Sequence, residues 1–207
     1  MKRRIHIFMA VVCAAALVPR ALEAGTGIKV GYSLAKIHQT SSGPLPFGWG
    51  DLRSLVLGFS FEGGLGPISL QPEFLYVRMG GRHSIDAANG LEYRFHYLQV
   101  PVMLKFDVIP FGPLRPFVAG GVYGSYLIKA QGVLTVAGET TKVGFTGDHE
   151  RLDYGAVGGA GLALKLPGIS LSVEGRYNYG LMNIIKNPAA GESMKNRCLM
   201  VLFGIRY

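Results

Sequence analysis

The chain is poor in the features that mark most secreted scaffolds and helical membrane proteins. Only 16% of its 207 residues are charged, and it has two cysteines, too few for a disulfide framework. After residue 25 no run of 18 apolar residues occurs, which excludes a transmembrane helix, and long amphipathic helical patterns are missing as well. Because 49% of the residues are nevertheless hydrophobic, the chain has enough apolar surface to fold.

The N-terminal segment has the pattern of an export signal. Three basic residues at positions 2–4 precede a mostly apolar stretch over residues 5–18, and the small residue Ala24 stands at the expected cleavage edge. This pattern predicts a secretory signal peptide over residues 1–24, with a buried N-terminal helix as the alternative. Residues 25–207 then form one exported domain, with a formal net charge of +5 instead of +8.

The exported domain contains few residues that indicate chemistry. Its basic residues are scattered along the sequence and match no nucleic-acid-binding motif, so we expect no nucleic acid partner. Cys198 is its single cysteine and is expected to be buried. We expect no cofactor, metal or phosphate-binding loop, since the Gly-Gly pairs lack a Walker lysine and the histidines lack metal-ligand spacing. These histidines are His38, His83, His96 and His149.

The main feature of the exported domain is a period-two alternation of apolar and polar residues. It is clearest from Ile169 to Leu181, where odd positions are apolar or aromatic and even positions include Glu174 and Arg176. Such alternation is typical of β-strands with one polar face. Together with two glycine-rich runs, the pattern predicts eight strands around residues 28–34, 54–62, 68–76, 98–107, 115–128, 152–165, 169–181 and 198–207.

The connections between these strands alternate in length. Short Gly/Pro turns fall at 63–67, 109–113 and 166–168, and long connections at 36–51, 79–91, 129–150 and 183–196. This asymmetry predicts an all-β fold, an eight-stranded antiparallel transmembrane β-barrel with up-and-down strands, since such barrels have short periplasmic turns and longer outer loops. Residues 133–145 are expected to form a protruding hairpin, because its arms are too short to make a ten-stranded barrel. A soluble eight-stranded barrel would instead turn its apolar face inward.

The polar face of the strands is expected to line the lumen. It carries nearly balanced charges, whereas the opposite face is almost free of charge, as a lipid-facing surface requires. Eight strands leave an interior just wide enough to be filled by side chains, so paired charges predict a polar, plugged lumen rather than a porin. Arg176 with Glu174, and Arg115 with Glu73 or Asp153, are the expected pairs. The lumen residues are Glu62, Glu73, Asp107, Asp153, Glu174, Lys29, Lys105, Arg115, Lys165, Arg176 and Arg206.

Aromatic and C-terminal residues fit the same interpretation. Phe61, Phe106, Tyr126 and Tyr179 stand near strand ends, where aromatic girdles form. Phe203, Ile205 and the terminal Tyr207 alternate along the last strand, in a pattern similar to the C-terminal signal that the outer-membrane barrel assembly machinery reads. We therefore expect that machinery to be a partner during biogenesis.

Four segments together resemble the PorT-type outer-membrane β-barrel family, which is related in shape to the small OmpA and OmpX barrels. They are Tyr97–Phe106, Arg115–Gly121, Asp153–Gly161 and Glu174–Leu181. The family usually has an acid where this chain has Gln99, so one lumen charge is missing. The resemblance implies the outer membrane of a Gram-negative bacterium, and the family's named member acts in type IX protein secretion.

These observations leave two classes of function. The first is a structural or interaction component of the cell envelope, in contact with outer-membrane lipid and lipopolysaccharide and with a further envelope protein, such as a secretion apparatus. The second is a small-pore transport or ligand-binding barrel for ions or hydrophobic compounds. An enzyme is not expected, because no catalytic motif occurs and the neighbouring His149, Glu150 and Asp153 are interpreted as a solvated rim.

Overall fold

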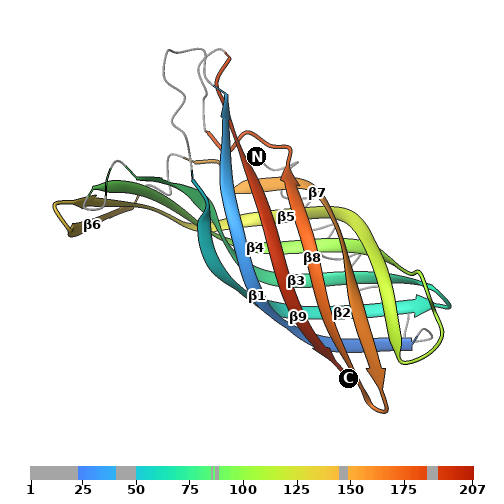
Figure 1. Cartoon of the computed structure of the whole chain (residues 1–207). Coiled ribbons are helices and arrows are strands. Elements are labelled where there is room, and N and C mark those ends of the chain that lie inside the picture. Colours follow the sequence, from blue (N-terminus) through green and yellow to red (C-terminus); the bar gives the residue numbers. More distant parts are fainter. Residues whose placement is uncertain (1–22, 41–49, 85, 87–88, 145–148, 186–190) are drawn as a thin grey trace.

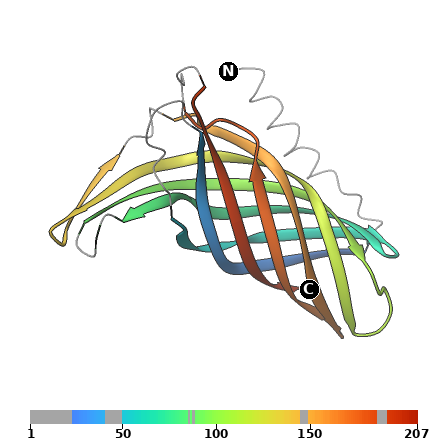
Figure 2. The ribbon, with the colours of Figure 1, turned by 45° about the horizontal axis from the view of Figure 1, so that its top comes forward.

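The computed structural model describes residues 23–40, 50–84, 86, 89–144, 149–185 and 191–207, so the predicted signal peptide lies outside the described residues up to residue 22. The described chain is built from nine antiparallel strands (Figures 1 and 2). They are β1 (Glu23–Thr40), β2 (Leu52–Leu65), β3 (Ile68–Ser84), β4 (Gly90–Asp107), β5 (Leu114–Val136), β6 (Glu139–Gly144), β7 (Leu152–Leu166), β8 (Ile169–Gly180) and β9 (Ser193–Arg206). No helix in these residues is long and apolar enough to cross a membrane.

Eight of the strands close into a ring. Consecutive ring strands pair with one another, and β5 is followed in the ring by β7. The first strand, β1, closes the ring by pairing with β9 from Gly27↔Arg206 to Thr40↔Ser193. The remaining strand, β6, pairs only with the last part of β5 and lies outside the ring. The predicted eight-stranded up-and-down barrel is therefore confirmed, with the expected hairpin formed by β5 and β6.

The two ends of the barrel differ. One end, here called the turn end, carries the connections 66–67, 108–113 and 167–168 together with Tyr207, whose backbone exchanges two hydrogen bonds with Thr26. The opposite end, here called the loop end, carries the longer connections. In outer-membrane barrels the short turns are periplasmic and the longer loops face outward.

The strands continue further at the loop end than the sequence pattern predicts. The prediction of long connections over residues 79–91 and 129–150 is wrong in its bounds. In the structure β3 runs to Ser84, β4 starts at Gly90, and β5 reaches Val136. Beyond the ring, β3, β4, β5 and β6 pair with one another and form a projecting sheet, here called the extension (Figure 1). It consists of residues 80–84, 90–95, 130–136 and 139–144.

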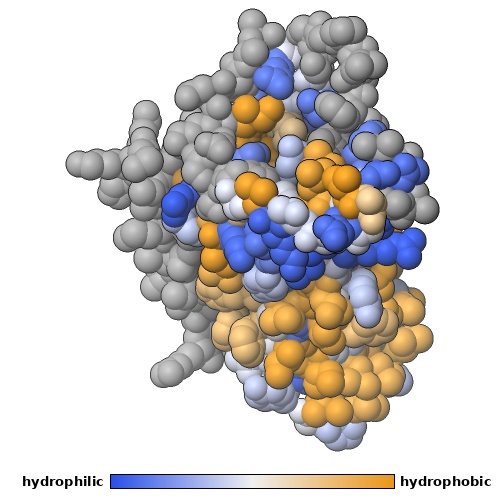
Figure 3. Space-filling model, turned by 90° about the vertical axis from the view of Figure 1, so that its left-hand side faces the viewer, coloured by the Kyte–Doolittle hydropathy of each residue, from blue (hydrophilic) through white to orange (hydrophobic). Residues whose placement is uncertain are grey.

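The outward face of the ring is an apolar band. Along β1, Ile28, Val30, Tyr32 and Leu34 are exposed, whereas the residues between them are buried, and the other ring strands alternate in the same way. The aromatic residues expected in girdles, Phe61, Phe106, Tyr126 and Tyr179, also lie on the outer surface. Figure 3 shows the resulting hydrophobic surface bordered by a hydrophilic band.

Some inward positions need glycine because a neighbouring strand approaches closely. A Cβ atom at Gly159 would lie 2.4 Å from the carbonyl oxygen of Gly175 and 2.8 Å from Cβ of Arg176. At Gly31 a Cβ would lie 2.0 Å from the carbonyl oxygen of Val201. The glycine-rich strands therefore relieve crowding inside a narrow ring.

Candidate functional site

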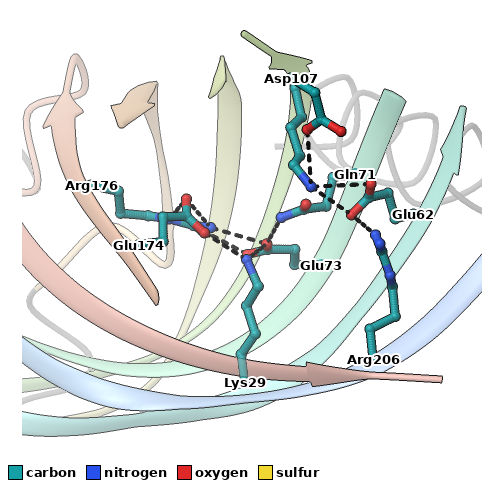
Figure 4. A network of polar contacts seen from close by, with 9 residues as sticks. Lys29, Glu62, Gln71, Glu73, Asp107, Glu174, Arg176 and Arg206 are labelled. Atoms are coloured by element: carbon teal, nitrogen blue, oxygen red, sulfur yellow. Dashed lines mark hydrogen bonds and ion pairs between the residues drawn. The ribbon is translucent and has the colours of Figure 1, made fainter. Parts of the chain in front are cut away.

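The middle of the barrel interior holds a network of buried ions, drawn in Figure 4. Lys29 of β1 lies between two carboxylates, with its Nζ 2.6 Å from Glu73 Oε1 and 2.8 Å from Glu174 Oε2. Arg176 of β8 donates through Nη1 and Nη2 to both oxygens of Glu73, at 2.6 and 3.0 Å. Arg176 also contacts Glu174 Oε1 from Nε at 2.9 Å. These four residues are here called the central ion cluster.

The central ion cluster is balanced and sealed from water. Two cations face two anions, and Gln71 adds a hydrogen bond from Nε2 to Glu73 Oε1. Glu73 has no exposed surface, and Glu174 and Arg176 are each 1% exposed. A buried charge is tolerated only with a complete set of partners, and here β1, β3 and β8 supply that set across the lumen.

A second group of ions lies towards the turn end. Lys105 Nζ is 3.2 Å from both oxygens of Glu62 and 3.7 Å from Asp107, and Arg206 also pairs with Glu62. Arg115 pairs with Asp107 at 3.7 Å. These five residues are here called the turn-end cluster. The expected pairing of Arg115 with Glu73 or Asp153 is wrong, because Arg115 lies near the beginning of β5, next to the turn, whereas the other two carboxylates lie deeper in the ring.

The remaining predicted lumen charges are not part of either cluster. Lys165 of β7 lines the mouth of the barrel at the turn end. Asp153 is buried towards the loop end, where Nδ2 of Asn196 donates to its Oδ2 at 2.9 Å. The Arg176–Glu174 contact is present.

A neutral polar layer follows the central ion cluster. Gln99 donates from Nε2 to Ser125 Oγ at 3.1 Å, and its Oε1 accepts from Asn178 Nδ2 at 2.9 Å. All three side chains are buried. The amide at position 99, where the PorT-type pattern has an acid, therefore matches partners that are themselves neutral.

The interior near the loop end is apolar, which the expectation of a polar lumen missed. Its buried side chains come from six ring strands, β1 to β5 and β9, and from the connection after β8. The alternation continues there in the opposite sense, since the neighbours of Met79 and Phe95 on the outer face are basic, so an expectation that assigns the polar face to the lumen misses them. The buried cluster comprises Ala35, Ile37, Leu52, Val56, Leu75, Val77, Met79, Phe95, Tyr97, Leu127, Ala130, Ile184, Met194, Cys198, Met200 and Leu202.

The connection between β8 and β9 covers this apolar interior. Ile184 donates a backbone hydrogen bond to Met194 and accepts one from Glu150, which holds the segment across the barrel opening. The Asn183 carboxamide fixes the turn, since its Oδ1 accepts from the backbone N–H groups of Ile185 and Met194. The Ile184 side chain has no exposed surface.

Little free space is left inside. A cavity of about 20 Å³ lies among lumen residues that include Lys29, Gln71 and Lys105, which is room for about one water molecule. At the turn end a vestibule of about 340 Å³ is lined by residues that include Asp107, Lys165 and Arg206. The interior is therefore a packed plug with a shallow polar mouth.

The histidines do not gather into a site in the described residues. His38 is exposed on β1, and His83 lies in the extension. His96 Nδ1 contacts the Tyr76 hydroxyl, and the His149 ring packs 4.9 Å from that of Phe95. His149, Glu150 and Asp153, interpreted above as a solvated rim, include one buried member, since Asp153 is 1% exposed. Within the described segments no three His, Cys, Asp or Glu side chains are placed to hold a metal ion.

Comparisons with known proteins agree with this geometry. Residues 22–186 match the family model described as outer membrane protein beta-barrel domain. Curated protein sequences give no significant match. Among solved structures, OprG of Pseudomonas aeruginosa has a TM-score of 0.51 at 12% identity, covering 90% of this chain and 97% of OprG.

Two further structures are similar over nearly their whole length. Neisserial surface protein A has a TM-score of 0.48 at 12% identity, covering 87% of this chain and 95% of its own. Ail of Yersinia pestis, crystallised with a heparin analogue, has a TM-score of 0.43 at 17% identity, covering 90% of this chain and all of Ail. At these identities the likeness concerns the fold alone.

Proposed function

Because the chain belongs to the outer membrane protein beta-barrel domain family, we propose that this outer-membrane β-barrel is a closed anchor that acts through its loop end. In this proposal the barrel is no channel, and the extension contacts another component of the cell envelope. The observation that carries it is the filled interior, in which two ion clusters, a neutral layer and an apolar plug follow one another. A secretion accessory is the specific form that the PorT-type resemblance supports.

The extension is the part of the described molecule best suited to a protein contact. All six residues of β6 are exposed, and its outer edge has no strand partner within the described residues. Unpaired strand edges and exposed apolar side chains, here Leu134, Val136 and Val143, favour pairing with another chain. The extension therefore supplies both backbone groups and apolar contacts to a partner.

Export and assembly complete the proposal. Residues 1–24 act as the signal peptide that brings the chain to the outer membrane of a Gram-negative bacterium. The side chains of Phe203, Ile205 and Tyr207 project outward from the last strand, where the barrel assembly machinery can read them. No reaction is assigned to the chain, since its buried carboxylates are occupied by cations and amides.

Conductance across a planar bilayer tests the closed state. The purified barrel is expected to show almost none, since its charges are paired and its loop end is apolar. An open porin in the same bilayer serves as the positive control. A steady ionic current through the wild-type barrel would overturn the proposal and favour the transport class.

Co-purification tests the envelope contact. A tagged chain is extracted from native outer membranes in mild detergent, beside a variant in which residues 132–143 are replaced by a short Gly-Ser turn. A stoichiometric envelope protein that is retained by the full chain and lost by the variant supports the proposal. A barrel that purifies alone in both forms contradicts it.

A further inference from the structure

The apolar outer band ends in basic residues at the loop end. On most ring strands, a lysine, arginine or histidine lies just beyond the exposed apolar residues of the outer band. Although these residues are scattered in the sequence, the strand register gathers them towards one end of the barrel. Figure 3 shows a hydrophilic band beside the hydrophobic surface on one face of the molecule. The basic residues are Lys36 on β1, Arg53 on β2, Arg78 on β3, His96 on β4, Lys129 on β5 and Arg197 on β9, with Arg151 directly before β7.

The strand register places several of these residues directly opposite one another. Arg78 is paired across the ladder with His96, which is paired in turn with Lys129. These three residues are here called the β3–β5 basic cluster. The His96 ring, whose Nδ1 contacts the Tyr76 hydroxyl, therefore stands between two cations, Arg78 and Lys129, that the register brings onto the same row.

A second basic group lies on the other side of the ring. Lys36 is directly opposite Arg197, and His38 is opposite Lys195. Arg197 stacks 3.5 Å from the centre of the Tyr179 ring and donates to the carbonyl oxygen of Gly180. These four residues are here called the β1–β9 basic cluster.

The protein itself supplies few anions to either group. Near this level Arg94 pairs with Glu92, with Nε 2.6 Å from Oε1. Arg78, Lys129, Lys36 and Lys195 form none within the described residues, and the Arg78 Nε atom is buried without a hydrogen-bond partner. The basic clusters therefore remain available to an external anion.

The turn end has the opposite character. There the basic residues point into the lumen, where Lys105 and Arg206 pair with Glu62, and the outward side chains are apolar, such as Phe106, Ile169 and Ile205. Among the described residues of the ring, outward-facing basic side chains therefore gather at the loop end and not at the turn end. A charge distribution set up for solubility alone would not distinguish the two ends.

We propose that the two basic clusters bind the phosphate groups of glycolipids in the outer leaflet, of the lipopolysaccharide type. This inference rests on the proposed function, which places the loop end at the outer surface. A phosphate between two directly opposed cations removes their repulsion, and arginine can donate to it through two N–H groups. The adjacent apolar band receives the acyl chains of the same lipid molecule, so one ligand covers both surfaces.

The test uses the full exported chain reconstituted in vesicles that contain phosphorylated or dephosphorylated lipid A. The variant combines Arg78→Gln with Lys129→Gln. The matched control combines Arg82→Gln with Lys142→Gln, which removes the same charge from exposed positions of the extension. After extraction, the glycolipid retained per barrel is measured by mass spectrometry at several salt concentrations.

The wild-type chain and the control are expected to retain phosphorylated lipid A and little of the dephosphorylated form. The Arg78/Lys129 variant is expected to retain about tenfold less, since each cation near an anionic lipid surface strengthens binding severalfold. Equal retention by variant and control overturns the inference, and so does displacement of the lipid by millimolar inorganic phosphate, which indicates a site for free phosphate. Retention of an acidic protein in place of the glycolipid also overturns it.

The same preparations keep the two proposals separate. Conductance and the gel mobility of the folded barrel report on the closed anchor, whereas lipid retention reports on the basic clusters. A closed, folded barrel that retains no phosphorylated lipid contradicts the present inference alone. A conducting barrel contradicts the proposed function alone.

Discussion

The two halves of the barrel interior are filled by opposite means. Towards the turn end, charged side chains from β1, β2, β3, β4, β5, β8 and β9 interlock in two ion clusters. Towards the loop end, methionine, leucine and aromatic side chains pack without charge. Both halves sit behind the same apolar outer band, so the lipid-facing pattern does not determine what fills the lumen.

This difference implies that the two halves tolerate amino-acid substitutions to different degrees. An ion cluster is stable only when every charge has its partner, and loss of one member leaves the others buried and unpaired. An apolar plug loses contacts gradually, and methionine side chains adapt to a new shape. The two halves should therefore respond differently to single substitutions of similar size.

The largest expected effect comes from breaking the central ion cluster. Replacing Glu73 with leucine leaves the buried Arg176 and Lys29 with only one carboxylate, Glu174, between them, and we expect the free energy of unfolding to fall by about 3–5 kcal/mol. Urea unfolding in lipid vesicles, followed by circular dichroism, measures it. Glu62→Leu is the matched comparison, since water reaches the turn-end cluster, and it should cost less. Equal losses of unfolding free energy in the two variants would show that burial of the ions does not determine the size of the loss.

Truncating a side chain of the apolar plug is expected to have a smaller effect. Met200→Ala removes a fully buried side chain, which costs about 2–5 kcal/mol in general. We expect the lower part of that range, because the flexible Met79 and Met194 belong to the same cluster and can move into the space. The same unfolding assay applies. A loss greater than that of Glu73→Leu contradicts the proposed order of the two halves.

Replacing the whole central ion cluster by apolar residues sharpens the comparison further. In a variant with Lys29→Met, Glu73→Leu, Glu174→Leu and Arg176→Met, no buried charge is left unpaired. Such replacements are often neutral, so we expect the free energy of unfolding to lie within about 1–2 kcal/mol of wild type. If this variant is as unstable as Glu73→Leu alone, the ions have a role in packing that apolar side chains cannot take.

The smallest expected effect concerns the segment that covers the plug. Ile184→Val removes one methylene group, which costs about 1 kcal/mol. Cys198 belongs to the same apolar cluster and is buried, so the rate at which a thiol reagent modifies it reports local opening. We expect a rate about fivefold higher in the variant. A rate that does not change would show that Ile184 does not control access to the plug.

The sequence predicted the ring well because alternation is a strong signal wherever one face is polar. Lys29 between Ile28 and Val30, and Glu174 between Val173 and Gly175, mark inward positions directly. Where Met79 and Phe95 point inward, the alternation continues in the opposite sense, with basic residues such as Arg78 on the outer face. The apolar plug could therefore not be predicted from period alone.

Other parts of the site depend on register, which a single sequence does not contain. The contact of Arg176 with Glu174 lies within one strand and could be predicted from the sequence. The contact of Arg115 with Asp107 could not, because it depends on how β4 and β5 align. The same holds for Arg78, His96 and Lys129, which are far apart in the chain and meet only through the ladder. Of the extension, only the hairpin over residues 133–145 was predicted, and the parts of β3 and β4 that pair beside it were missed because they lack a continuous apolar face.

The closure of the ring between β1 and β9 has a consequence for how the protein folds. Gly27 pairs with Arg206, so the contacts that complete the barrel join residues from opposite ends of the chain. Contacts of such high sequence separation form slowly, because the entropy of the intervening chain is lost before the contact stabilises it. Ring closure must therefore await synthesis of the last strand, and until then β1 and β8 each present an unpaired edge that has to be kept from aggregating on its way to the membrane.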